Sequence, residues 1–440
     1  MGRGPHSSIG SSSQSADERA PSQGTHGAAH TIQKEVEGEH RQAPGLQEAR
    51  GELARYFGPG DEQRNVVSDS VVRALGIPAQ ARAAFAAEDA TNRDWLTGYT
   101  AGYNRYLAEQ GGNAPGSWCA GEDWVRPATP EDFTGRMVLL AQTLPRMAGA
   151  LAAAQPPAAA STAAVSERLV AEAADAMALS GLGSNAWALG SERTENGRGL
   201  LLANPHYPWY GGNRFWEKHL TIPGTLDVYG AHLLGAPGVA IGFNRGVAWS
   251  HTVSDSERVV LYQLELVPGE PTRYFLDGEP RSMTSRTVGV PVLGEDGAVT
   301  EVERTLWFSH LGPVLTMPGM PWTETTAFTA RDANAENTYL LSQWRAMNLA
   351  TDLDSFIEAH RRWNAMPWVN TMAASADGRA LYLDNSTVGN LSEEAIAALR
   401  THPDFLRIEA YLRSYPGGLP LQLRVVPGLV AHGVERYGTY

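Results

Sequence analysis

Residues 181–216 read GLGSNAWALGSERTENGRGLLLANPHYPWYGGNRFW. A Gly-Leu-Gly triplet leads into Ser184, and the run that follows predicts a strand over residues 185–190. The polar segment 192–199, which contains Asn-Gly, predicts a turn, and residues 200–203 predict a second strand. The stretch therefore predicts a β-hairpin with a serine at its first residue.

The position of Ser184 suggests a nucleophile that the chain itself activates. An ordinary mid-chain serine is a poor nucleophile because nothing takes its proton. Cleavage of the Gly183–Ser184 bond would give Ser184 a free α-amine, whose pKa of about 8 suits a general base. Gly183 leaves its own carbonyl unshielded, so the Ser184 hydroxyl can attack it and start that cleavage. We therefore predict autocleavage between Gly183 and Ser184, with Ser184 as the catalytic nucleophile.

Five motifs follow one another along the chain: GSNAWALG, LLANPHYPW, GFNRGVAWSHTVSD, RDANAENT and PWVNTMAA. In this order and spacing they closely resemble the penicillin/cephalosporin acylase family of N-terminal-nucleophile hydrolases, over residues 46–400. The sequence is most similar to the branch of aculeacin A acylases and acyl-homoserine-lactone acylases, which deacylate amides carrying long fatty chains. The resemblance implies an α+β fold with the four-layer αββα sandwich of these hydrolases, incomplete at both ends.

The chain divides into five predicted regions. Residues 1–45 are of low complexity, which predicts a disordered tail, and residues 46–154 form a mostly helical α-chain region. Residues 155–183 begin as an Ala/Pro/Ser segment; we interpret them as the spacer freed by self-cleavage, and an interdomain linker is the alternative. Residues 184–404 form the β-chain catalytic region, and residues 405–440 match no family pattern.

Secondary structure follows from the spacing of apolar residues. Helices are predicted over residues 81–110, 130–154, 337–348 and 353–363. Strands are predicted over residues 215–222, 226–233, 239–243, 247–253, 259–267, 369–375 and 380–384. Trp95, Tyr99, Tyr103 and Tyr106 recur at helical spacing, which predicts core packing; the resemblance offers the acyl pocket as the alternative. Helices followed by many strands and then helices predict an α+β architecture.

The resemblance also implies roles for residues near the nucleophile. His206, in ANPHYPW, matches the histidine that orients the serine and its amine. Val253, in SHTVSD, matches the position whose backbone N–H donates to the oxyanion. Asn185 would brace the nucleophile or lie at the strand edge as an ordinary polar residue, and His251 is predicted to be structural.

An apolar pocket should hold the acyl group of the substrate. Tyr207, Trp209, Leu233, Trp368 and Val369 are the candidates for its walls, with ordinary core packing the alternative for each. Apolar walls suit a fatty tail because each buried methylene contributes about 0.8 kcal/mol. The implied substrate is a small acylated amide, such as a lipopeptide antibiotic or an N-acyl-homoserine lactone.

One part of the family's chemistry has no counterpart in the sequence. In the family a second oxyanion donor is an Asn side chain, in an Asn-x-Asn-Asp-Ser-x-Trp-like motif downstream of the PWVN segment. Loss of such a donor costs about 10²–10³ in rate. Two hypotheses follow: a self-processing acylase that forms an α/β heterodimer from one precursor, or a truncated, catalytically inactive homologue that at most binds acyl chains.

Composition excludes several other classes of function. The net charge of −13 argues against a nucleic-acid or anionic-membrane partner. A single cysteine, Cys119, excludes an internal disulfide framework and a cysteine-based metal site. Asp255 and Glu257 are interpreted as carboxylates of a solvated turn, so no metal and no cofactor is predicted. No run approaches the roughly 18 apolar residues of a membrane span, and no signal peptide is visible, whereas the resemblance implies a secreted or periplasmic protein.

Overall fold

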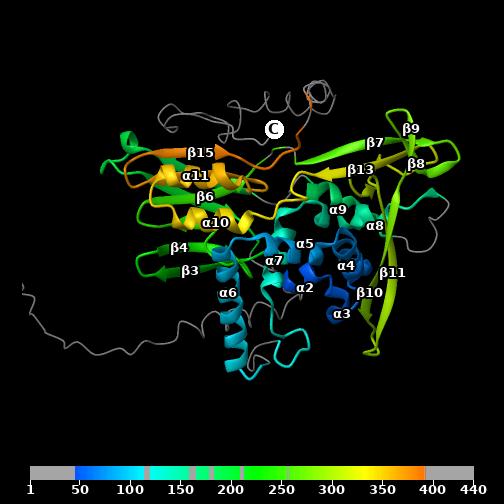
Figure 1. Cartoon of the computed structure of the whole chain (residues 1–440), viewed down its shortest axis with the longest axis horizontal. Coiled ribbons are helices and arrows are strands. Elements are labelled where there is room, and N and C mark those ends of the chain that lie inside the picture. The colour runs from blue at the N-terminus through cyan, green and yellow to red at the C-terminus, as the bar shows by residue number, and fades with distance from the viewer. Residues whose placement is uncertain are drawn as a thin grey trace, which may run out of the picture.

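The computed structural model describes residues 45–112, 119–157, 165–177, 183–208, 213–254, 256, 258–390 and 392. The predicted tails, residues 1–45 and 405–440, lie outside these residues apart from Gly45. Helices come first along the described chain, antiparallel strands follow, and two helices precede the last two strands (Figure 1). The α+β class is therefore confirmed.

The first part of the chain is helical. Its helices are α2 (Gly45–Arg50), α3 (Leu53–Phe57), α4 (Arg64–Leu75), α5 (Ile77–Ala87), α6 (Ala90–Glu109), α7 (Pro130–Ala141) and α8 (Ala148–Ala153). The single helix predicted over residues 81–110 is wrong, because Glu88 is extended and ends α5. The Asp89 side chain then accepts a hydrogen bond from the Asn92 N–H (2.8 Å) and caps the start of α6.

The helix predicted over residues 130–154 is also broken. Between α7 and α8 lies a 3₁₀ turn, Leu144–Met147. The carboxylate of Asp332, which is buried, accepts hydrogen bonds from the N–H groups of Thr143 (2.6 Å) and Leu144 (3.2 Å). These two N–H groups donate to Asp332 instead of to carbonyls of the preceding helical turn, so the helical hydrogen bonding ends after Ala141. The same contact ties the helical region to a strand almost 190 residues later.

A six-stranded antiparallel sheet forms the centre of the predicted catalytic region, in the order β15-β14-β6-β5-β4-β3. Its strands are β3 (Phe215–Ile222), β4 (Leu226–Leu233), β5 (Ile241–Phe243), β6 (Val247–Val253), β14 (Val369–Ser375) and β15 (Ala380–Asp384). Five of the six have the predicted bounds, and β5 begins two residues later than predicted. Trp249 lies opposite Ala373, and Ala248 opposite Ala374, so these two pairs point to opposite faces of the sheet.

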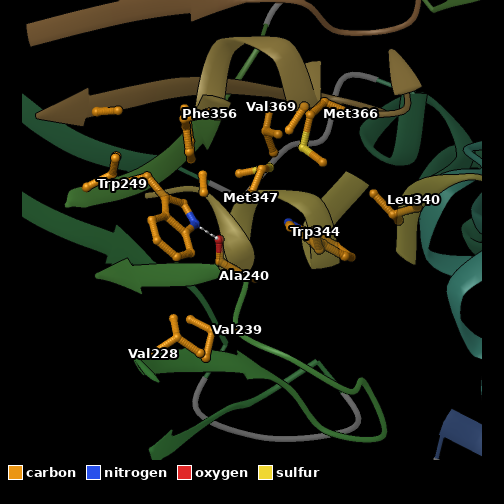
Figure 2. Packing of buried hydrophobic residues seen from close by; sticks show 14 of the residues in the cluster. Val228, Val239, Ala240, Trp249, Leu340, Trp344, Met347, Phe356, Met366 and Val369 are labelled. Carbon is orange, nitrogen blue, oxygen red and sulfur yellow. Dashed lines mark hydrogen bonds between the residues drawn. The ribbon is translucent and has the colours of Figure 1, made fainter. Parts of the chain in front are cut away.

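Helices α10 (Leu340–Leu349) and α11 (Leu353–Trp363) cover the face that carries Trp249 (Figure 1). Figure 2 shows the resulting core, in which Phe356 of α11 lies near the indole of Trp249, with ring centroids 5.7 Å apart, and Met347 and Trp344 of α10 belong to the same cluster. The Trp249 Nε1–H donates to the carbonyl of Ala240 (2.6 Å), which satisfies the one polar group of a large buried side chain. Burial of this cluster fixes the helix pair on the sheet.

The opposite face of the sheet carries a two-stranded hairpin, β1 (Gly183–Leu189) and β2 (Leu200–His206). Ala188 packs there with Met372 and Ala374 in a small buried cluster. At the turn end of the hairpin, the Gly199 N–H donates to the Ser375 carbonyl (3.0 Å). Both strands are longer than predicted, and His206 belongs to β2. Helices, sheet and hairpin thus lie in the order expected for the αββα sandwich.

A second group of strands packs against the first helices. One sheet has the order β12-β13-β7-β8-β9, and β10 pairs with β11 in a separate ribbon. Their bounds are β7 (Val259–Val267), β8 (Glu270–Leu276), β9 (Glu279–Ser282), β10 (Thr284–Leu293), β11 (Val299–Phe308), β12 (Val314–Leu315) and β13 (Thr326–Asp332). Helix α9 (Glu167–Met177), which falls in the predicted spacer, buries Leu169 and Ala173 in the same core.

Candidate active site

A largely apolar cavity lies where the hairpin meets the end of β6 and β14. Its volume is about 50 Å³. Its walls come from α7, the hairpin, the central sheet and α10, and consist of Leu140, Ser184, Pro205, Tyr207, Phe215, Leu233, Ala240, Ile241, His251, Thr252, Val253, Trp344, Pro367, Trp368 and Val369. An apolar cleft with few polar groups is the usual form of a small-molecule site.

Ser184 lies in the wall of this cavity and is buried. It is the second residue of β1 and pairs with Pro205 of β2. Its hydroxyl donates a hydrogen bond to the carbonyl of Gly183. The hydroxyl is thus beside the peptide group that the sequence predicts to be cleaved, and on the cavity side of the hairpin.

His206 lies next to Gly183, on the other face of the hairpin from Ser184. His206 is paired with Gly183 across the strands, and successive side chains of a strand alternate between its faces, so His206 and Ser184 lie on opposite faces. The Nε2 atom of His206 is 3.1 Å from the amide nitrogen of Asn204 and 3.4 Å from that of Asn185. Both neighbours are side-chain NH₂ groups, which can donate to Nε2 in the tautomer that has its N–H at Nδ1. A side-chain carbon at Gly183 would be 3.7 Å from Nδ1, so Nδ1 is close to Gly183, the residue before the predicted cleavage point.

Val253 lies at the end of β6, in the cavity wall and opposite Val369 of β14. Its carbonyl accepts a hydrogen bond from the side-chain amide of Asn370 (2.9 Å). The Tyr382 hydroxyl donates to the Oδ1 of that same Asn370 (2.9 Å). Our sequence reasoning missed Asn370, although it is the last residue of the PWVN motif. It holds the backbone of the predicted oxyanion donor in place.

Four of the five predicted pocket residues, Tyr207, Leu233, Trp368 and Val369, do line the cavity. Trp209 lies outside the described residues. No sequence pattern indicated Leu140, because it belongs to α7 and is more than 40 residues before Ser184. The aromatic residues of α6 lie elsewhere: Tyr99 packs edge-on against Phe133 of α7, with ring centroids 4.9 Å apart.

Trp368 is held from two directions. Its Nε1–H donates to the Leu140 carbonyl (3.1 Å), and the Arg146 guanidinium lies 5.2 Å from the centre of its ring. Arg146 also donates to the Leu140 carbonyl (3.4 Å). Burial lowers the pKa of Arg146, opposed by the nearby hydroxyl of Tyr207. This wall of the cavity therefore joins residues that precede Ser184 to residues that follow it.

His251 is the main polar side chain in the cavity wall besides Ser184. Its Nε2 accepts from the indole N–H of Trp344 (3.4 Å), and its Nδ1 lies 3.1 Å from the hydroxyl of Thr371. Burial lowers the pKa of His251 to about 3, so the ring is neutral at physiological pH. Both ring nitrogens are occupied by protein groups, in agreement with a structural role.

The described residues contain no group of three or more His, Cys, Asp or Glu side chains placed to hold a metal ion. Asp255 and Glu257 are not among the described residues. No helix in the described ranges is long and apolar enough to cross a membrane.

Comparison with known proteins gives one consistent set of similarities. The penicillin amidase family profile matches residues 46–406. The acyl-homoserine lactone acylase PvdQ of Pseudomonas fluorescens (strain Pf0-1) is 43% identical over 356 residues, which are 79% of this chain and 46% of that protein. The aculeacin-A acylase of Actinoplanes utahensis is 38% identical over 373 residues, 80% of this chain and 46% of that protein. A thermostable penicillin G acylase from Alcaligenes faecalis aligns with a TM-score of 0.42 at 22% identity, over 48% of this chain and 36% of that one. The chain spans about half the length of the curated relatives it matches.

Proposed function

This chain belongs to the penicillin amidase family, and on that premise we propose that it is a self-processing acylase of fatty-acyl amides. In this proposal the chain cleaves itself before Ser184 and then hydrolyses its substrate through a Ser184 acyl-enzyme. The observation that carries the proposal is the position of Ser184, which lies in the wall of an apolar cavity with its hydroxyl against the Gly183 carbonyl.

Self-cleavage would use the residues already in contact. The Ser184 oxygen attacks the Gly183 carbonyl carbon, the bond to the Ser184 nitrogen breaks, and an ester links the two residues. The leaving nitrogen takes the hydroxyl proton and becomes an α-amine. Water then opens the ester and leaves a carboxylate on Gly183. The Nδ1–H of His206, which faces Gly183, would polarise the carbonyl during the attack.

Amide hydrolysis would follow the same route with a new acyl group. The α-amine of Ser184 takes the hydroxyl proton, and the serine oxygen bonds to the substrate carbonyl carbon. The backbone N–H of Val253 stabilises the negative oxygen, and Asn370 keeps that strand end in place. The amine then protonates the leaving nitrogen. Water attacks the acyl-enzyme and releases the fatty acid, which restores the serine.

The cavity suits an acyl chain rather than a polar group. Apart from Ser184, Thr252 and His251, its walls are apolar or aromatic. Both ring nitrogens of His251 already contact other side chains of the protein, Trp344 and Thr371. Each methylene that enters such a cavity contributes about 0.8 kcal/mol. We propose a small fatty-acyl amide as substrate, either a lipopeptide antibiotic or an N-acyl-homoserine lactone, and an α/β heterodimer as the mature form. A secreted or periplasmic location is part of the same proposal.

A second candidate function is acyl binding without hydrolysis. It is favoured by the largely apolar wall of the cavity, which offers contacts to an acyl chain whether or not the neighbouring amide bond is hydrolysed. In this candidate the cavity binds an acyl chain but no amide bond is hydrolysed. Measuring binding and hydrolysis separately therefore distinguishes the two functions.

The first experiment is intact mass and N-terminal sequencing of the purified chain and of Ser184→Ala. We expect a new N-terminus at Ser184 in the wild type and a single 47.4 kDa chain in the variant. An uncleaved chain in both would overturn self-processing. Incubation with N-dodecanoyl-homoserine lactone then separates the two functions: release of free amine supports the acylase, whereas saturable binding of dodecanoate without release of amine supports the second candidate.

A further inference from the structure

Tyr382 lies on β15 and reaches the layer between the hairpin and the central sheet. Its ring is half-buried and packs against the small cluster that contains Ala188 of β1 and Met372 of β14. Tyr382 and Met372 are paired across the strands, so both point to the face of the sheet that carries the hairpin. Ser184 is on the same side of β1 as Ala188, because every second residue of a strand shares a face. The ring of Tyr382 therefore supports the strand that carries the predicted nucleophile.

The hydroxyl of Tyr382 reaches the other side of the site through Asn370. It donates to the Oδ1 of Asn370 (2.9 Å), whose side chain is buried. The Nδ2 of Asn370 in turn donates to the carbonyl of Val253 (2.9 Å) and to the hydroxyl of Thr252 (3.1 Å). A continuous set of hydrogen bonds thus runs from β15, across β14, to the end of β6.

The donors and acceptors of this set leave one arrangement. An amide side chain can be turned by 180° so that its oxygen and nitrogen exchange places. A backbone carbonyl can only accept, so the NH₂ group of Asn370 must face Val253. The amide oxygen then faces the phenol of Tyr382, which must donate to it. Without that hydroxyl, a buried amide oxygen loses its donor, and the side chain gains a reason to move away from Val253.

The end of β6 has few other backbone contacts to hold it. Among the described strands, β5 pairs with β6 only at Ala248 and Trp249, and beyond Trp249 the pairing of β6 is with β14. Just after β6, the Ser254 N–H donates to the carbonyl of Trp368 (3.0 Å). The side chain of Asn370 adds to these contacts from the same neighbouring strand. The position of this strand end therefore depends on how Asn370 is held.

We propose that Tyr382 is a positioning residue that fixes the Val253 strand end relative to the hairpin of Ser184. Its ring supports the hairpin, and its hydroxyl acts through Asn370 on the backbone of Val253. Tyr382 is not among the residues that line the cavity, so it does not touch the substrate. The inference rests on the proposed function, in which the Val253 N–H stabilises the negative oxygen formed by attack of Ser184.

The first test is Tyr382→Phe, which keeps the ring and removes the hydroxyl. With N-dodecanoyl-homoserine lactone we expect kcat to fall about tenfold, less than the 10²–10³ for outright loss of an oxyanion donor. KM should stay within about twofold, because the negative oxygen is absent from the bound ground state. Tyr274→Phe is the control: it removes a phenol hydroxyl that lies 2.7 Å from His310 Nδ1 in a separate core, and it should leave kcat unchanged.

A double-mutant cycle shows whether Tyr382 acts through Asn370. Asn370→Ala should lower kcat at least as far as Tyr382→Phe does, and the double variant should be no slower than Asn370→Ala alone. Losses that multiply would mean that the two side chains act separately, which would overturn the inference. Asn370→Ala also breaks the same connection if Tyr382→Phe does not fold.

A measurement without turnover separates the inference from the proposed function. In the Ser184→Ala background, Tyr382→Phe should make the Ser254 amide exchange hydrogen at least fivefold faster, while the amide of Trp249 in the middle of β6 is unchanged. A wild-type chain that releases no amine would overturn the proposed function, and exchange at Ser254 would still decide the inference. Unchanged exchange, unchanged kcat, an equal loss in Tyr274→Phe, or a rise in KM that matches the fall in kcat would each overturn it.

Discussion

His360→Asn should make this protein less sensitive to acid. The His360 side chain lies on α11 and is fully buried, with Nδ1 2.9 Å from the Gln343 amide nitrogen and 2.9 Å from the Asn385 amide oxygen. Burial lowers the pKa of His360 to about 4, from an ordinary value of 6.5. Asparagine keeps a polar group near Nδ1 but takes up no proton. The substitution therefore removes a titration and retains part of the hydrogen bonding.

The sign of the effect follows from which state binds the proton. Below pH 6.5 the unfolded chain protonates His360 while the folded chain does not, so the free energy of unfolding falls as the pH is lowered from 6.5 towards 4. At pH 5 the loss is about 2 kcal/mol for this one ring. It is close to zero at pH 8, where both states are neutral. His251, with its pKa lowered to about 3, adds a similar loss.

The assay is urea unfolding at pH 8 and pH 5, followed by tryptophan fluorescence. The difference between variant and wild type at pH 8 gives the change in packing alone and serves as the control. We expect the fall in unfolding free energy between pH 8 and pH 5 to be about 2 kcal/mol smaller in His360→Asn than in the wild type. An equal fall in both proteins would refute the idea that His360 is buried in its neutral form.

Three further outcomes are expected. Asp332→Ala leaves the N–H groups of Thr143 and Leu144 without their acceptor and should lower the unfolding free energy by about 3 kcal/mol in urea titration; a loss below about 1 kcal/mol would contradict this account. Ala240→Leu adds three carbon atoms to the cavity wall and should reduce kcat/KM for a dodecanoyl amide by roughly 10- to 60-fold relative to a hexanoyl amide, whereas equal losses for both chain lengths would be inconsistent with an acyl pocket. Gly183→Ala should still cleave, within about tenfold of the wild-type rate by intact mass over time, because the added carbon meets His206 Nδ1 at an ordinary 3.7 Å; a complete block would show that glycine itself is needed.

Local sequence patterns predict the strands well and the helix ends poorly. Residues 369–375 and 380–384 have the predicted bounds, because an apolar run and an Asp-Gly turn define that hairpin without outside help. The end of α7 depends on Asp332, which is distant in sequence, so no local pattern could reveal it. The break before α6 did have a local signal, since Asp89 is a favourable capping residue.

The site residues also divide into those that a local sequence motif indicates and those that only the packing of distant elements reveals. Val369 could be named because it lies in the PWVNTMAA motif. Leu140 could not, since only the packing of α7 brings it to the cavity. The side of the hairpin on which His206 lies depends on the pairing of Gly183 with His206, and the register of a hairpin with a long turn is not fixed by composition.

The hydrogen bond from Trp368 to the Leu140 carbonyl has a consequence for how the two halves of a cleaved protein would stay together. If the chain is cut before Ser184, Leu140 and Trp368 belong to separate polypeptides, and the cavity lies at the interface between them. A ligand that fills this cavity would bind the two polypeptides together and neither of them alone. By mass action, a ligand of this cavity would then stabilise the pair: the higher its concentration, the further the cleaved protein could be diluted before its two parts separate.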